Sequence, residues 1–249
     1  MIFDVHCHLN LVEKETDIKK VIEDAKKNEL IIVSNGIDVE TNRKMLDYKK
    51  EYDNVLICLG IYPEHILSMK NEDIELEIDF IEKNKNIIAG IGEVGIDLSK
   101  EDYKEGIDKQ KNYFSKFVEL SIRINKPITV HSRKAEEICI EILEKLKAKK
   151  VVMHYFSGKM SLVKRIIENG WTLSIPTAVK NLEHFQKVID IAPIEQLLCE
   201  TDSPYSHPDK KFPNNPNNVI TSYEMIAKIK KISLEDTKIQ IEKNFNNLF

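Results

Sequence analysis

The sequence predicts an α/β protein folded as one (β/α)8 TIM-like barrel, with residues 1–249 forming a single domain. Three observations support this prediction. Eight short apolar runs recur along the chain, charged segments with helical spacing separate them, and no Gly/Ser-rich linker divides the chain. The apolar runs are IFDVH (2–6), LIIVSNG (30–36), VLICLGIYP (55–63), IIAGIGEVG (87–95), PITVHS (127–132), KVVMHYF (150–156), WTLSIP (171–176) and QLLCETD (196–202).

The segments between the runs are longer, as expected for helices that cover a parallel sheet. We expect helices at roughly 16–28, 39–51, 72–84, 104–125, 134–148, 159–169, 179–190, 217–231 and 234–247. An open, doubly wound sheet is the alternative. Such folds usually carry a glycine-rich first turn, whereas CHLNLVEKE after the first run has no glycine. A Pro- and Asn-rich loop, residues 203–218, follows the eighth run, where barrels keep binding loops.

The composition is that of an ordinary globular protein, with 42% hydrophobic and 31% charged residues. We expect no membrane span and a cytoplasmic location, because the chain has no long uncharged apolar stretch and no signal-peptide pattern. Four scattered cysteines without a Cys-x-x-Cys motif predict reduced, buried thiols. The formal net charge of −4 argues against a protein that coats nucleic acid, although an enzyme that meets a phosphate locally remains possible.

Residue types that bind metals gather at the carboxyl ends of the predicted strands. They are His6, His8, Glu93, His131, His154 and Asp202. In a closed barrel these strand ends form one ring, so residues far apart in the sequence become neighbours. Each residue alone has a structural explanation, such as a hydrogen-bonded core histidine or a turn carboxylate. Their shared position at five strand ends instead favours a site for two divalent metals.

The opening stretch MIFDVHCHLN shows how one strand would contribute to such a site. Alternate side chains of a strand share a face, so Asp4, His6 and His8 lie on one side. Cys7 lies on the other side and is not expected to join the histidines. The pair His6/His8 is therefore either half of a metal site or a chance arrangement, and the residues at the ends of the other strands distinguish these alternatives.

The same alternation places polar residues beside two other candidate ligands. On the fifth strand His131 and Arg133 share a face, with Ser132 opposite. Arg133 could then reach a phosphoryl oxygen as a forked donor, or form a structural salt bridge. On the eighth strand Glu200 shares a face with Asp202 and could orient a metal ligand.

Six motifs, DVHCHL, GIYPEH, GIGEVGID, VHSR, HYFSG and CETDSP, resemble those of the TatD family of metal-dependent hydrolases, within the amidohydrolase-like barrels. The match covers nearly the whole chain, down to the terminal NFNNLF. The resemblance implies a distorted (β/α)8 barrel with a two-metal centre, and a DNA substrate. It also implies that Glu93 is shared by both metals, that His6, His8 and Asp202 hold one of them, and that His131 and His154 hold the other. The sequence does not fix the metal, and Mg, Mn and Zn all fit the residue types.

The chain departs from the family pattern in three places. After the third strand the family usually has Gly-x-His-Pro, whereas this chain has GIYPEH, so a phosphate contact would fall to Tyr62 or to His65. The family's Gly-x-Asp-Tyr becomes GIDL (95–98), and its late Arg-Asn-Glu-Pro becomes PNNP (213–216). Candidate substrate-binding residues are therefore Tyr62, His65, Arg133 and Ser157. The differences affect substrate choice and leave the candidate ligands intact.

The resemblance implies a 3′–5′ exodeoxyribonuclease acting on single-stranded DNA. In this mechanism a water between the two ions loses a proton near neutral pH. Asp202 would be the general base or an orienting group, Glu93 would hold the ions and Arg133 the phosphodiester. The alternatives are a D-aminoacyl-tRNA deacylase or other ester or amide hydrolase on the same barrel, and a metal-dependent scaffold without activity. No protein partner is predicted.

Overall fold

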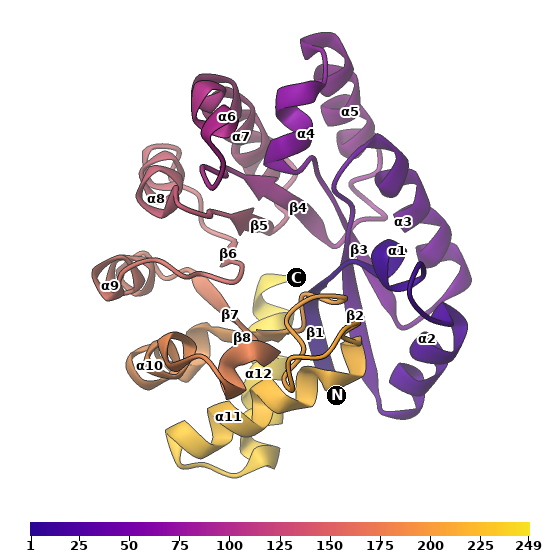
Figure 1. The fold of residues 1–249 in the computed structure, drawn as a ribbon, viewed down its shortest axis with the longest axis vertical. Helices are drawn as coiled ribbons and strands as arrows, with labels where there is room; N and C mark the ends of the chain where they lie inside the picture. Colours follow the sequence, from indigo (N-terminus) through magenta and orange to yellow (C-terminus); the bar gives the residue numbers. More distant parts are fainter.

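The computed structural model describes residues 1–249 and contains one sheet of eight strands in the order of the sequence. Every consecutive pair of strands is parallel. The strands are β1 (Ile2–Cys7), β2 (Leu30–Asn35), β3 (Val55–Leu59), β4 (Gly90–Gly95), β5 (Ile128–His131), β6 (Val151–Met153), β7 (Thr172–Pro176) and β8 (Leu197–Glu200). Figure 1 shows the strands around a common centre with helices outside them, which confirms the predicted barrel.

The sheet closes where the first and last strands meet, a place called the β1–β8 junction below. The backbone N–H of Asp202 donates a hydrogen bond of 2.9 Å to the carbonyl of His6. The buried carboxylate of Asp4 accepts from the backbone N–H of Thr201 at 2.8 Å and from its hydroxyl at 2.6 Å. The closure therefore depends on residues just beyond β8, and it aligns the carboxyl ends of the two strands.

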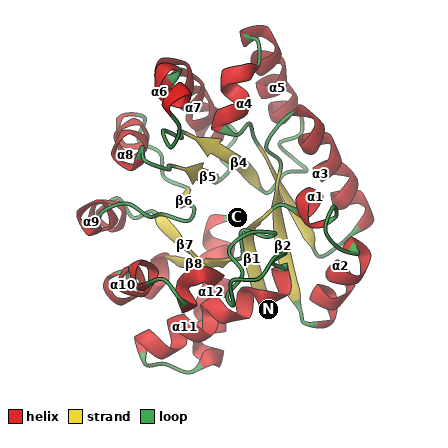
Figure 2. Cartoon of the chain, viewed as in Figure 1, coloured by secondary structure: helices red, strands yellow, loops and turns green.

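Helices lie between and around the strands (Figure 2). They are α1 (Leu9–Val12), α2 (Ile18–Lys27), α3 (Val39–Glu51), α4 (Pro63–Ser68), α5 (Asn71–Lys83), α6 (Glu101–Glu105), α7 (Ile107–Arg123), α8 (Glu136–Lys145), α9 (Met160–Glu168), α10 (Glu183–Ile191), α11 (Ile220–Lys230) and α12 (Leu234–Leu248). Three 3₁₀ turns are η1 (Thr177–Lys180), η2 (Ile194–Gln196) and η3 (Pro216–Val219). None of the helices combines the length and the apolar character needed to cross a membrane.

Local sequence signals explain where several helices begin. Asp17 caps α2 by accepting from the backbone N–H of Lys19 at 3.1 Å. Asp38 and Thr41 form a reciprocal capping box at the start of α3. Pro63 occupies the first turn of α4, where its missing N–H costs no hydrogen bond. These signals therefore set the residues at which α2, α3 and α4 begin.

The core lies between the strands and the helices, and all four cysteines are buried and free, as expected. The strands are buried on both faces, as in other parallel sheets with helices around them. The two last helices pack behind β1. Phe245 of α12 stacks on Phe3 with ring centroids 4.0 Å apart, and the Tyr223 hydroxyl of α11 accepts from the Phe3 backbone N–H at 2.8 Å.

Some boundaries differ from those expected. The predicted helix 104–125 is divided at Gly106 into α6 and α7. The third apolar run, 55–63, is a strand only to Leu59, because the proline at its end begins α4. The predicted helix 179–190 is preceded by the η1 turn and starts at Glu183 as α10. Two short helices, α1 and α4, lie outside the expected ranges, and the order of the eight strands is as predicted.

Candidate metal centre

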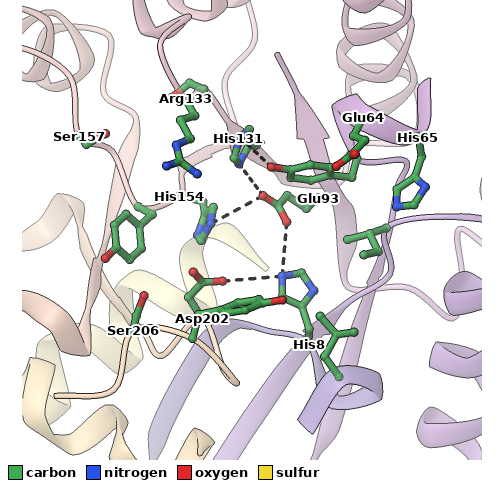
Figure 3. Close-up of a pocket in the computed structure, with 16 residues that line it drawn as sticks. His8, Glu64, His65, Glu93, His131, Arg133, His154, Ser157, Asp202 and Ser206 are labelled. Atoms are coloured by element: carbon green, nitrogen blue, oxygen red, sulfur yellow. Dashed lines mark hydrogen bonds and ion pairs between the residues drawn. The ribbon is translucent and has the colours of Figure 1, made fainter. Parts of the chain in front are cut away.

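Six side chains from five strands meet where the strands end, on the side of the barrel that also carries the 203–218 loop. They are His6, His8, Glu93, His131, His154 and Asp202, and are called the donor cluster below. The structure brings together all of the ligands proposed from the sequence. Within the cluster, three groups of three residues have nitrogen or oxygen atoms within 4.8 Å of one another. Figure 3 shows the Glu93 carboxylate between the surrounding imidazoles.

Glu93 divides the donor cluster into two halves. Its Oε2 atom lies 3.6 Å from Nε2 of His6 and 3.4 Å from Nε2 of His8. Its Oε1 atom lies 2.8 Å from Nδ1 of His131 and 3.7 Å from Nε2 of His154. Burial acts to raise the pKa of Glu93, but hydrogen bonds from His131 and His8 outweigh it and hold that pKa well below its ordinary value. Each oxygen of an ionised carboxylate therefore faces its own pair of imidazoles.

Asp202 adds a second carboxylate on the β1 side of the cluster. Its Oδ1 atom lies 3.7 Å from Nε2 of both His6 and His8. The backbone of Asp202 has a φ of +53°, in the left-handed region that aspartate adopts more readily than most residues. Burial raises the pKa of Asp202 to about 6, against the opposing charge of His154. A carboxylate with a pKa near neutrality is suited to accept and release a proton.

The outer nitrogen of His154 is held by Glu200 of β8. His154 Nδ1 lies 2.8 Å from Glu200 Oε2, and the backbone N–H of Tyr155 donates to the other oxygen at 3.1 Å. The Ser174 hydroxyl also donates to Glu200, so the buried carboxylate is fixed from three sides. An acceptor at Nδ1 keeps the proton there and leaves Nε2, the inner nitrogen, free to bind a cation.

Asp97 holds His131 in the same way and was not among the residues proposed from the sequence. Asp97 Oδ2 lies 3.0 Å from Nε2 of His131 and accepts from the Tyr62 hydroxyl at 3.1 Å. Burial acts to raise the pKa of Asp97, but hydrogen bonds from His131 and Ser99 hold it below its ordinary value. Asp97 follows the carboxyl end of β4 by two residues, so the rule that located the other ligands could have found it.

The two histidines of the β1 side differ in their outer nitrogens. His8 Nδ1 lies 3.2 Å from the Asn35 carbonyl oxygen, whereas His6 Nδ1 is buried without a hydrogen-bond partner. Burial, together with the charge of His154, lowers the pKa of His6 well below its ordinary value. His6 is therefore a neutral imidazole whose inner nitrogen faces two carboxylates. A buried neutral imidazole between carboxylate oxygens fits a metal ligand.

The donor cluster opens into a cavity of about 650 Å³. All four candidate substrate-binding residues from the sequence line this cavity. Tyr62 lies against the cluster, with its hydroxyl 3.3 Å from His131 Nε2. His65 lies farther out, with Nε2 3.8 Å from an oxygen of Asp38. Of the two residues that could replace the usual family histidine, Tyr62 is the one in contact with a proposed ligand.

Arg133 is exposed, forms no ion pair, and extends toward the donor cluster (Figure 3). The alternative of a structural salt bridge is therefore wrong. The expected alternation does not continue past His131, because β5 ends there, and Ser132 lines the same cavity as Arg133. Ser157 is exposed at the edge of the cavity, away from Glu93 (Figure 3).

Replacing Glu200 with Gln is expected to weaken metal binding about 10- to 100-fold, because a neutral amide is a weaker acceptor for His154 Nδ1–H than a carboxylate. Competition with a chelating dye measures this affinity. Glu77→Gln is the matched control, since Glu77 is also a buried carboxylate but pairs with Arg43 away from the cluster. An equal loss of affinity in both variants would mean that the effect of Glu200 is one of general stability.

A parallel barrel with buried imidazoles and carboxylates at the carboxyl ends of its strands is typical of metal-dependent enzymes. Comparisons with known proteins identify the family to which the chain belongs. The family model "TatD related DNase" matches residues 3–249. The chain belongs to the TatD family, and it is a metal-dependent hydrolytic enzyme.

Three similar proteins illustrate the relationship. The uncharacterized metal-dependent hydrolase MJ1582 of Methanocaldococcus jannaschii is 37% identical over 246 residues, covering 99% of this chain and 96% of that protein. The human deoxyribonuclease TATDN3 is 32% identical over 256 residues, covering 99% and 93%. The crystal structure of YJJV, a TatD homologue from Escherichia coli, superposes with a TM-score of 0.91 at 20% identity, covering 100% and 97%. This last likeness supports the fold alone.

Proposed function

We propose that the enzyme hydrolyses phosphodiester bonds and removes nucleotides from the 3′ end of single-stranded DNA. The observation that carries this proposal is the position of Glu93, whose two oxygens each face a separate pair of imidazoles. A carboxylate in that position can be shared by two ions. Two closely spaced ions suit displacement at a phosphodiester, in which the attacking and the leaving oxygen both carry charge.

The donor set assigns the residues that would hold the two ions. His6, His8 and Asp202 would hold one ion, His131 and His154 the other, and Glu93 both. Neutral imidazoles with two carboxylates are compatible with Mg, Mn or Zn. When bound, such ions supply Lewis acidity, which polarises a phosphoryl oxygen and makes a water molecule more acidic.

The chain's own residues would orient the substrate and move the proton. The Arg133 guanidinium, which has no ion-pair partner, would form a forked pair of hydrogen bonds with a phosphoryl oxygen pair. Asp202 would accept the proton of the attacking water, because its carboxylate lies at the cluster, 3.7 Å from Nε2 of both His6 and His8. Asp97 and Glu200 would keep His131 and His154 in the orientation that the cluster needs.

Two further observations support DNA as the substrate. A relative with 32% identity is named a deoxyribonuclease, and the matching family model carries the same description. The net charge of −4 suits a site that takes the end of a strand rather than a long electrostatic track.

Single-stranded DNA labelled at its 5′ or its 3′ end tests the proposal directly. The metal content of the purified protein is measured first, and cleavage is then followed with Mg, Mn or Zn. We expect a ladder of shortened products from the 5′ label and immediate release of a labelled nucleotide from the 3′ label. No cleavage by metal-loaded protein would contradict the proposal and make a D-aminoacyl-tRNA ester the next substrate to examine.

Replacing Arg133 with Ala is expected to raise the KM for DNA about 10- to 100-fold, since a charge-assisted hydrogen bond contributes about 1.5–3 kcal/mol. Arg133→Lys should recover only part of the loss, because an ammonium cannot form the forked pair. Arg123→Ala is the matched control, because Arg123 is exposed on α7 and pairs with Glu82. Steady-state kinetics of the three variants give the answer, and an unchanged KM in Arg133→Ala would exclude a substrate contact.

A further inference from the structure

Two aromatic rings are left in solvent while the others are covered. Among the Phe, Tyr and Trp side chains of the chain, only Tyr205 and Phe212 are exposed, at 51% and 59%. Both belong to the 203–218 loop between β8 and α11, and their ring centroids lie 6.4 Å apart with the planes tilted by 41°. Neighbouring exposed aromatic rings on one loop form an apolar surface that the fold itself does not use.

One ring of this aromatic pair lies in the wall of the cavity that holds the donor cluster. Tyr205 lines the same cavity as Glu93 and Asp202, and its backbone N–H donates to the Asp202 carbonyl at 2.8 Å. Phe212 lies beside Tyr205 on the same loop, and Figure 1 shows this loop, in orange, over the end of β1. A chain whose end enters the cavity would meet Tyr205 at the wall, with the Phe212 ring 6.4 Å from it.

The loop that carries the rings is held in place by several polar contacts. The Asn214 side chain donates to the Thr201 carbonyl at 3.0 Å, and the Thr177 hydroxyl donates to the Ser206 carbonyl at 2.7 Å. Asn181 also donates to a loop carbonyl, that of Pro208. The backbone that carries the two rings is therefore held in place before any ligand arrives, which reduces the conformational entropy that the loop loses on binding.

The charges around the rings are complementary to a nucleic acid. Lys210 and Lys211 immediately precede Phe212, are exposed, and take part in no ion pair. Asp209, the nearest acidic residue of the loop, is paired with Lys180 at 2.6 Å. Two free ammonium groups beside two exposed rings match a strand that carries a phosphate for every base.

We propose that Tyr205 and Phe212 form a stacking surface for unpaired bases of the DNA strand whose 3′ end enters the cavity. This inference rests on the proposed function and adds the binding site for the strand adjacent to the scissile bond. The flat faces of the rings stack on any base without reading its sequence, while the lysines contact the backbone. The surface favours single strands, because the bases of a duplex are already stacked on one another.

The test measures the Kd of metal-loaded full-length protein for a fluorescein-labelled single-stranded oligonucleotide with phosphorothioate linkages at its 3′ end, which resist hydrolysis. A second oligonucleotide of the same length lacks the bases of its last three nucleotides. The proteins are wild type, Tyr205→Ala/Phe212→Ala, Tyr205→Phe, and Leu76→Ala, which removes an exposed apolar side chain from α5. Thermal unfolding verifies that every variant is folded.

We expect the double variant to bind the normal oligonucleotide at least about 10-fold more weakly than wild type, given the usual strength of base–aromatic stacking. The two proteins should bind the abasic oligonucleotide equally, and Tyr205→Phe and Leu76→Ala should bind both as wild type does. Equal Kd values for wild type and double variant with normal DNA, or equal losses with both oligonucleotides, would overturn the stacking surface. Binding is measured without cleavage, so the two proposals can fail separately. Binding that depends on the rings, in an enzyme that hydrolyses no DNA, would refute only the proposed reaction. Cleavage of DNA by an enzyme whose binding does not depend on the rings would refute only this inference.

Discussion

The Glu93→Gln variant is expected to lose most of its bound metal and at least about 10³-fold in kcat/KM for hydrolysis, equivalent to about 4 kcal/mol of transition-state stabilisation. The reason lies in the two oxygens of Glu93, which face the imidazoles of His8 and His131 on opposite sides. An amide offers one weak oxygen ligand and one NH2 group, which cannot bind a cation. The substitution conserves the size of the side chain, so the cluster loses a ligand without gaining a cavity.

Elemental analysis of the purified variant measures the number of ions per chain, and kinetics on the best substrate measure the activity. Glu64→Gln is the matched control for metal content, because Glu64 lines the same cavity but pairs with Lys100 at 3.5 Å, outside the donor cluster. We expect this control to retain its metal. Full metal content in Glu93→Gln would show that the remaining residues of the cluster suffice and that the shared-carboxylate assignment is wrong.

The Gly95→Ala variant is expected to lose more than about 4 kcal/mol of unfolding free energy, an exceptional loss for a single methyl group. Gly95 ends β4 with a φ of +150°, and a Cβ atom there would lie 1.8 Å from the His131 carbonyl oxygen. That oxygen also accepts from the backbone N–H of Ile96 at 3.1 Å, so it cannot move without breaking the contact between β4 and β5. Since His131 is in the donor cluster, the variant should also bind metal poorly.

Gly170→Ala separates the effect of the clash from that of the backbone conformation. Gly170 also has a positive φ, of +72°, but a Cβ atom there meets nothing within 4 Å. Gly170→Ala should lower the free energy of unfolding by only about 1–2 kcal/mol, which is the energy needed to place an L-residue in the left-handed region. Urea denaturation gives both free energies, and similar losses in the two variants would mean that β5 shifts to accept the methyl group.

The sequence predicts the barrel and the donor cluster because both follow from one rule. Parallel strands end on the same side of a sheet, so ligand-type residues at the ends of separate apolar runs must converge. His131 and His154 are 23 positions apart and follow successive strands, and the closed sheet brings both of them beside Glu93. This rule requires no knowledge of side-chain packing, so the sequence alone is enough to predict the six proposed ligands.

Other parts of the site have no such signal. The acceptor for His8 Nδ1 is the backbone carbonyl of Asn35, and a backbone group is present at every position of a sequence. The exposure of Tyr205 and Phe212 depends on how the 203–218 loop is anchored, which follows from contacts with η1 and with residues after β8. Alternation predicted that Ser132 faces away, but it applies only as far as β5 extends.

The β1–β8 junction has a consequence for the order of events during protein synthesis. The first strand leaves the ribosome early, yet the carboxylate of Asp4 finds its partner in Thr201, 197 positions later in the chain. Until β8 has been translated, His6 and His8 have neither Asp202 beside them nor a closed sheet around them. Nascent chains therefore lack part of the donor cluster, and we expect metal uptake to follow the synthesis of β8.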